Sequence, residues 1–220
     1  GLAPCIQEAI DNACDHCKLG YIPDPWKQRV AEACAGWQRT HYGWNVDPSI
    51  IRVVPDVLEA YEIFLRELVG AGNSVIVPTP AYMPFLSVPK LYDVNVIEIE
   101  MLQSSDTETG EAQWLFDFDA IERAFAAGCH AFVLCNPHNP IGKVLTLEEE
   151  LRLSDLAAQY DVRIFNDEIH APFVFEGKHI PFPTISEQAA LQSMTATSAS
   201  KSFNIPGTKC AQVLLTNLTD

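Results

Sequence analysis

The feature that most limits the fold of this chain is the regular alternation of short strand-like runs with longer helical stretches. The runs, most of them continuously apolar, cover residues 74–77, 94–100, 130–135, 162–165, 194–196 and 211–215. Between them, residues 116–127 and 147–160 carry apolar side chains at helical spacing. Apolar runs without alternation are typical of parallel strands that helices cover on both faces. We therefore predict an α/β protein with three layers, α/β/α, and a mostly parallel sheet.

The remaining segments give the expected organisation of the chain. Residues 4–19 and 26–40 have helical spacing on either side of a Gly/Pro-rich break, so residues 1–45 are expected to form an N-terminal helical segment. Residues 46–220 then form the main domain. Within that domain we also expect a strand over 50–54, a helix over 57–69 that ends at a glycine signal, a helix over 82–91, and a polar loop over 103–113.

The charge of the chain argues against several classes of partner. Its 14 basic and 29 acidic residues give a net charge of −15, so nothing favours attraction to a nucleic acid backbone. No window approaches the roughly 18 to 20 apolar residues of a membrane span. Residues 1–20 lack the basic end and apolar block of a signal peptide. We expect no nucleic acid or membrane partner and a cytoplasmic location.

The seven cysteines form an odd set in a chain large enough to bury a core, which favours reduced thiols over a disulfide framework. Cys14, His16 and Cys17 resemble half of a zinc site, but the chain offers no second pair of ligands at matching spacing. The same cysteines also suit one face of the first helix as small apolar side chains. We expect no metal site.

The loops that follow the predicted strands contain an unusual set of polar and aromatic groups. They supply an aromatic ring (Tyr82), an amide (Asn139), a carboxylate (Asp167), an amine (Lys201) and hydroxyls close to a second cation. Ligands of open α/β sheets bind at the carboxyl ends of the strands, so these groups are expected to converge on one rim. An aldehyde cofactor with a pyridine ring and a phosphate requires an amine, a carboxylate, hydroxyls and a cation of this kind.

Three segments of the chain resemble one family. HNPIG at 138–142, DEIH at 167–170 and SASKSFNIPGTK at 198–209 are similar to the fold type I pyridoxal-phosphate enzymes of the class I/II aminotransferase superfamily. Within it, NDEIHAPFVFEGKHIPFPTIS followed by SKSFNIPG most resembles the cystathionine β-lyase-like C–S lyases. The resemblance implies that residues 46–220 are the large, pyridoxal-phosphate-binding domain of the aspartate aminotransferase-like fold.

The resemblance also implies roles for individual residues. Lys201 would bind the cofactor covalently and later move the proton of the substrate Cα. Asp167 would pair with the pyridinium nitrogen, Asn139 would donate to the phenolate oxygen, and Tyr82 would stack on the ring. His170 either contacts the cofactor or is a packed structural histidine.

A phosphate site is implied in the same way. Ser198 and Lys209 would bind the phosphate, with Ser200 a weaker candidate, and the backbone at Val57 and Leu58 would cradle it. Lys209 stands where relatives more often have arginine. A lysine offers the phosphate a single point charge, whereas an arginine offers a bidentate fork. Asp56 stands where relatives commonly have glycine, and its carboxylate would repel a phosphate unless it points away. Tyr21 matches a tyrosine that reaches the phosphate of the neighbouring subunit, which implies a homodimer.

The implied activity is a C–S β-lyase that converts cystathionine or another S-substituted cysteine, a small amino acid substrate, into thiol, pyruvate and ammonia. An aminotransferase shares the same residues, and a non-catalytic or regulatory relative of the same fold is a further alternative. The resemblance also implies an N-terminal segment before residue 4 and a C-terminal small domain with the carboxylate-binding arginine beyond residue 220. On that basis we expect the last strand to be incompletely buried and the chain alone to bind substrate weakly or not at all.

Overall fold

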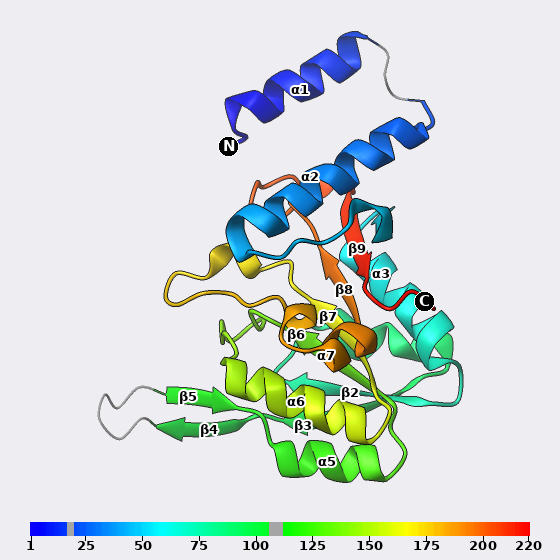
Figure 1. Cartoon of the computed structure of the whole chain (residues 1–220), viewed down its shortest axis with the longest axis vertical. Helices are drawn as coiled ribbons and strands as arrows, with labels where there is room; N and C mark the ends of the chain where they lie inside the picture. The colour runs from blue at the N-terminus through cyan, green and yellow to red at the C-terminus, as the bar shows by residue number, and fades with distance from the viewer. Residues whose placement is uncertain (17–19, 106–111) are drawn as a thin grey trace.

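A seven-stranded sheet forms the centre of the computed structural model, which describes residues 1–16, 20–105 and 112–220. The strand order across the sheet is β1-β9-β8-β7-β6-β2-β3 (Figure 1). The strands are β1 Ile51–Val54, β2 Ser74–Thr79, β3 Asn95–Glu100, β6 Ala131–Cys135, β7 Arg163–Asp167, β8 Ser193–Thr197 and β9 Ala211–Leu215. Among these described strands, β9 alone runs opposite to the other six, so the predicted mostly parallel sheet is confirmed.

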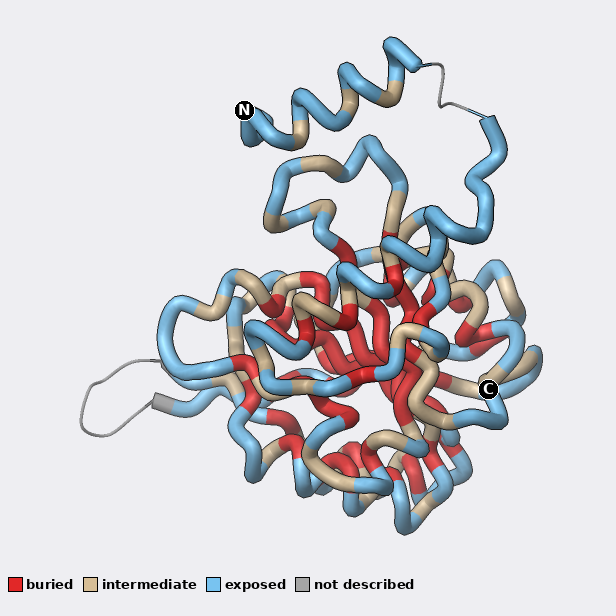
Figure 2. The backbone as a smooth tube through the Cα atoms, turned by 45° about the horizontal axis from the view of Figure 1, so that its top comes forward, coloured by how far each residue is buried: buried red, intermediate tan, exposed pale blue. Residues whose placement is uncertain are grey.

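Side chains along each central strand divide between two cores, one on each face of the sheet. In β6, Val133 packs into one core while Phe132 and Leu134 pack into the other. In β7, Phe165 and Ile164 are separated in the same way. Successive side chains of a strand point to opposite faces of the sheet. Because both faces are covered, the residues that point to either face had to be apolar. Figure 2 shows the buried backbone concentrated in the middle of the molecule. The predicted three-layer α/β/α architecture is confirmed.

Helices cover both faces of the sheet, and all of them except the last were expected from helical spacing. They are α3 Val57–Ile63, α4 Pro84–Ser87, α5 Phe118–Ala126, α6 Leu147–Gln159 and α7 Glu187–Gln192. The predicted helix over 57–69 is present, but its second half, Phe64–Val69, has π-helical hydrogen bonding before the chain leaves at Gly70. Helix α6 begins with a capping box between Thr146 and Glu149.

Three expectations about individual elements were wrong in detail. The strand expected over 74–77 continues through Pro78 to Thr79, because it is paired in parallel with β3 along its length. The helix expected over 82–91 is divided into α4 and a 3₁₀ turn, Pro89–Tyr92, by its prolines. The polar loop expected over 103–113 contains most of an antiparallel pair, β4 Leu102–Ser105 and β5 Ala112–Leu115. Residues 106–111 between them lie outside the described residues.

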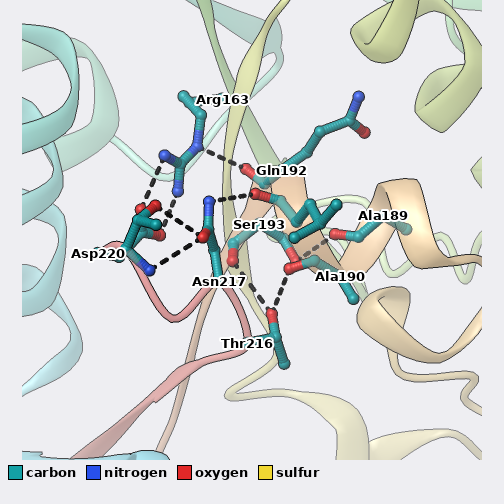
Figure 3. A network of polar contacts seen from close by, with 10 residues as sticks. Arg163, Ala189, Ala190, Gln192, Ser193, Thr216, Asn217 and Asp220 are labelled. Carbon is teal, nitrogen blue, oxygen red and sulfur yellow. Dashed lines mark hydrogen bonds and ion pairs between the residues drawn. The ribbon is translucent and has the colours of Figure 1, made fainter.

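The expectation of an incompletely buried last strand was also wrong. Strand β9 lies inside the sheet between β1 and β8, and its first four residues are buried. The residues after it fold back on α7 and the start of β7 (Figure 3). Asn217 Nδ2 donates to Leu191 O, and Arg163 Nε donates to Gln192 O while its guanidinium pairs with Asp220.

The N-terminal residues form two helices at one end of the molecule, α1 Pro4–Asp15 and α2 Asp24–Tyr42 (Figure 1). Helix α2 packs against the β1–β9 edge of the sheet through Ala31 and Ala35. Helix α1 contains no buried residue. Cys17 of the zinc-like motif lies outside the described residues. In the part of the chain that is described, no group of three metal-ligating side chains gathers, and no helix is long and apolar enough to cross a membrane.

Candidate active site

A cavity of about 190 Å³ opens at the rim where the parallel strands end. All the site residues predicted from the sequence line it, except Tyr21. They are Val57, Leu58, Tyr82, Asn139, Asp167, His170, Ser198, Ser200, Lys201 and Lys209. The residues converge because the loops that follow parallel strands lie at the same edge of the sheet, which is also where ligands of such sheets bind.

The reversed direction of β9 explains how a residue that precedes a strand joins residues that follow strands. Ala211 at the start of β9 pairs with Val54 at the end of β1, and Gln212 pairs with Thr197 at the end of β8. The segments just before β9, after β1 and after β8 therefore meet on the same rim. They contribute Lys209, Asp56 and Ser198 respectively.

Asp167 ends β7 at the floor of the cavity. It is 5% exposed, and its Oδ1 accepts the Ile169 N–H at 3.0 Å. Burial raises the pKa of Asp167 to about 7, although the Ile169 N–H and the ammonium of Lys201 act in the opposite direction. An added cation in the cavity would restore the charged form of this carboxyl.

Lys201 and His170 line the same cavity as this carboxyl. Lys201 is exposed to the cavity and acts electrostatically on both Asp167 and His170. Burial lowers the pKa of His170, and the charge of Lys201 lowers it further, so the imidazole is neutral at pH 7. A neutral ring at the cavity wall can hydrogen-bond to a ligand as well as pack against one.

The loop that carries Asn139 is tied to three parts of the fold. Asn136 N donates to Asp167 O at 3.0 Å, and its side chain links Glu150 Oε1 to the Leu145 N–H. The ring of His138 bonds to Pro80 O at 2.8 Å, in the turn that leads to Tyr82. These bonds fix the relative positions of the amide and the aromatic ring at the cavity wall.

The Ser198 hydroxyl is engaged within its own loop. It donates to Cys210 O at 2.8 Å and accepts the Ser200 N–H at 3.0 Å. In this arrangement Ser198 orders the loop that carries Ser200 and Lys201, and its proton points to the backbone of Cys210.

Asp56 does not point away from the cavity. Its Oδ1 accepts the Glu59 N–H at 2.9 Å, which caps helix α3, and its Oδ2 pairs with Lys209 Nζ at 2.6 Å. The sequence drew attention to both residues separately, but the ion pair between them depends on the β1–β9 register and was not predicted.

The sequence did not predict a buried polar cluster that lies beneath the cavity floor. Glu168 Oε1 accepts from Asn166 Nδ2 at 2.7 Å and from Phe182 N at 3.0 Å, while Oε2 lies 3.2 Å from His179 Nε2. Glu150 is fully buried nearby, and its Oε2 has no hydrogen-bond partner among the described residues. The DEIH and GKH segments contain Glu168 and His179, but only the fold brings Glu150 to them.

Tyr21 lies outside the cavity. Its side chain is fully exposed, at 105% relative accessibility, in the segment between α1 and α2. The cavity walls instead include apolar residues that the sequence analysis did not select, among them Phe85, Cys135 and Ile169. Cys135 could have been found from its place as the last residue of the apolar run 130–135.

Comparisons with known proteins agree with this fold and site. The chain matches the model of the family "Aminotransferase class I and II" over residues 5–217, and it belongs to that family. Cystathionine beta-lyase of Corynebacterium glutamicum is 36% identical over 220 residues, which are 100% of this chain and 56% of that protein. The chain spans about half the length of the curated relatives it matches.

Solved structures give the same picture. A Corynebacterium diphtheriae protein assigned as a pyridoxal-phosphate-dependent β-cystathionase aligns with a TM-score of 0.90 and 36% identity, covering 100% of this chain and 55% of its own. Cystalysin from Treponema denticola, whose structure contains a pyridoxal 5′-phosphate cofactor, aligns with a TM-score of 0.89 and 27% identity. That alignment covers 100% of this chain and 54% of cystalysin.

Proposed function

We propose that this chain forms the pyridoxal-phosphate-binding part of a C–S β-lyase that acts on cystathionine or another S-substituted cysteine. The observation that carries the proposal is the meeting of one amine, Lys201, and one buried carboxyl, Asp167, in a cavity at the strand ends. The likeness to a cystathionine beta-lyase along the whole chain supports the choice of reaction.

The chemistry of the cavity fits this cofactor. A buried carboxyl with a pKa near 7 suits a cationic ring nitrogen, which would keep it charged. Asn139 and Tyr82 supply an amide and an aromatic face at the wall, and the hydroxyl and ammonium groups of Ser200 and Lys209 supply contacts for a phosphate. When bound, pyridoxal phosphate supplies an electron sink for bond cleavage at the substrate Cα and Cβ.

The residues of the chain then have distinct tasks. Lys201 Nζ would be the amine that holds the aldehyde of the cofactor, and it would take the proton from the substrate Cα. Asp167 keeps the ring nitrogen protonated, and Asn139 donates to the phenolate oxygen. These roles would serve the overall conversion of an S-substituted cysteine and one water into thiol, pyruvate and ammonia.

The test uses the full-length protein. With pyridoxal phosphate it should absorb near the edge of the visible range, Lys201→Ala should abolish this band, and the exposed-lysine control Lys90→Ala should keep it. Addition of cystathionine should release pyruvate and free thiol in equal amounts. A colourless wild-type protein after reconstitution would contradict the proposal.

An aminotransferase is the second candidate, because the matched family is that of class I and II aminotransferases. Both reactions begin with removal of the Cα proton, so the residues at the floor of the cavity serve both. Transfer of the amino group to an added keto acid without release of thiol would identify the aminotransferase and reject the lyase.

We also propose that the protein acts as a homodimer in the cytoplasm. The side chain of Tyr21 is fully exposed in the N-terminal segment. In a dimer its hydroxyl would reach the phosphate in the cavity of the partner subunit. The cysteines resolved in the described residues are free thiols, which suits a reducing compartment.

A further inference from the structure

Asp56 and Lys209 form an ion pair at the mouth of the cavity. Lys209 Nζ lies 2.6 Å from Asp56 Oδ2, and both side chains are partly exposed. They line the same cavity as Ser200 and Lys201. The ammonium that is available to an incoming phosphate is therefore already partnered by a carboxylate of the chain itself.

The negative charge of Asp56 is not needed for its structural task. Its Oδ1 caps α3 by accepting the Glu59 N–H at 2.9 Å. Asparagine and serine cap helices about as well as aspartate does, because each offers one oxygen acceptor. What distinguishes the carboxylate at position 56 is its full charge, which acts on Lys209.

The carboxylate keeps this charge in the neutral pH range. Burial tends to raise the pKa of Asp56, but the hydrogen bonds from Lys209 and the Glu59 N–H outweigh it, so the pKa lies below its usual value. Protonation therefore does not release Lys209 near pH 7.

The backbone conformation of Lys209 also indicates that the surrounding structure fixes this residue in place. Lys209 has φ 50° and ψ 65°, in the left-handed region that residues with a Cβ adopt rarely. Such conformations persist where the surrounding structure fixes them, and they gather at functional sites. The pairing with Asp56 fixes the end of this side chain at the cavity mouth.

We propose that Asp56 sets the affinity of the cavity for a phosphate group, by holding Lys209 in place while opposing the dianion that Lys209 would bind. The role rests on the proposed function, since the phosphate is that of its cofactor. With a carboxylate at this position the pair has zero net charge before a phosphate enters, and a neutral residue would leave the positive charge of Lys209 unpaired. Cofactor binding is consequently weaker and more readily reversed than in a site with an uncharged residue at position 56.

The variant Asp56→Asn removes the charge and keeps the cap, and Asp56→Ser is a second variant with the same logic. In the full-length protein, Asp56→Asn should bind pyridoxal phosphate at least about tenfold more tightly by absorbance titration. Pyridoxal, which lacks the phosphate, should bind the variant and the wild type equally. Inorganic phosphate should raise the Tm of Asp56→Asn more than that of the wild type.

The matched control is Asp117→Asn. Asp117 also caps a helix, accepting the Ala120 N–H at 2.9 Å, but it lies outside the cavity. This control should leave both phosphate effects unchanged. Lys209→Met should weaken phosphate binding, and adding Asp56→Asn to it should recover only part of the loss.

The outcomes separate this role from the proposed function. If pyridoxal phosphate binds but Asp56→Asn and Asp56→Ser bind it no more tightly than the wild type, the role of Asp56 is wrong while the function stands. If pyridoxal phosphate does not bind the wild type, the function fails, and a larger effect of inorganic phosphate on Asp56→Asn still supports the role of Asp56. An equal effect of inorganic phosphate on both would overturn it.

Discussion

Glu150 is an acidic residue in an apolar position, since it lies fully buried on the inner face of α6. Burial raises the pKa of Glu150 to about 8, and the nearby Glu168 carboxylate adds to the rise. At pH 7 the group is therefore mostly protonated in the folded protein. Its Oε1 accepts from Asn136, so this neutral acid holds the loop that carries Asn139.

This residue should make stability depend on pH in a definite direction. The folded protein holds the Glu150 proton up to about pH 8, whereas the unfolded chain loses it near pH 4.5. The free energy of unfolding should therefore fall as pH rises between these values, by on the order of 4 kcal/mol. Glu150→Gln mimics the protonated form and should remove this fall.

Urea unfolding of both proteins at pH 5 and pH 8 measures the effect. The exposed Glu148, in the first turn of the same helix, gives the control Glu148→Gln, which should retain the fall. Equal pH dependence of the wild type and Glu150→Gln would show that Glu150 is ionised in the folded protein.

At the level of elements, a cluster of aromatic rings joins β7 to the helices on one face. The Phe165 ring centroid lies 5.0 Å from that of Tyr61 in α3 and 5.6 Å from that of Phe64, in the π-helical turns. It lies 6.3 Å from that of Phe85 in α4. Phe165 stands two residues before Asp167, so this packing also fixes the end of β7 at the cavity floor.

Phe165→Ala should destabilise the fold by about 3–5 kcal/mol, because it removes a fully buried ring and leaves a cavity. Denaturant unfolding measures this, and Phe175→Ala, at a ring that is 90% exposed, is the matched control with a change within about 0.5 kcal/mol. A loss below about 1 kcal/mol for Phe165→Ala would mean that the helices close over the gap.

The sequence predicted the elements whose signals are local. Helix α6 and strands β6 and β9 were expected within a residue or two of their observed bounds, because periodicity and continuous apolar runs fixed them. The strand through Pro78 and the β4–β5 pair depend on which neighbours supply hydrogen bonds, and that information is not local. At the site, Tyr82, Asn139, Asp167 and Lys201 came from strand-end loops, whereas the Asp56–Lys209 pair required the register of β9.

For the whole molecule, the proposed dimer makes Tyr21 the test residue. Tyr21→Phe removes only the hydroxyl, so it should leave the sedimentation of the dimer unchanged. It should weaken pyridoxal phosphate binding about tenfold, the size expected for a hydrogen bond to a charged group.

Conservative replacement of another exposed residue of the same segment, Ile22→Val, is the control and should change neither property. A monomer in sedimentation velocity runs at micromolar concentration, or an unchanged affinity for Tyr21→Phe, would contradict the shared site.

The place of β9 in the sheet has a consequence for how the molecule is made. Strand β1 pairs with β9, and Ile51 meets Leu214 roughly 160 positions later, a very non-local contact of the kind that slows folding. On the ribosome, β1 therefore emerges long before its partner does. Until residues 209–215 are synthesised, β1 and β8 each lack a neighbouring strand and the mouth of the cavity lacks Lys209. Assembly of the rim therefore waits for these residues, and until then the nascent chain has unpaired strand edges open to chaperones and to aggregation.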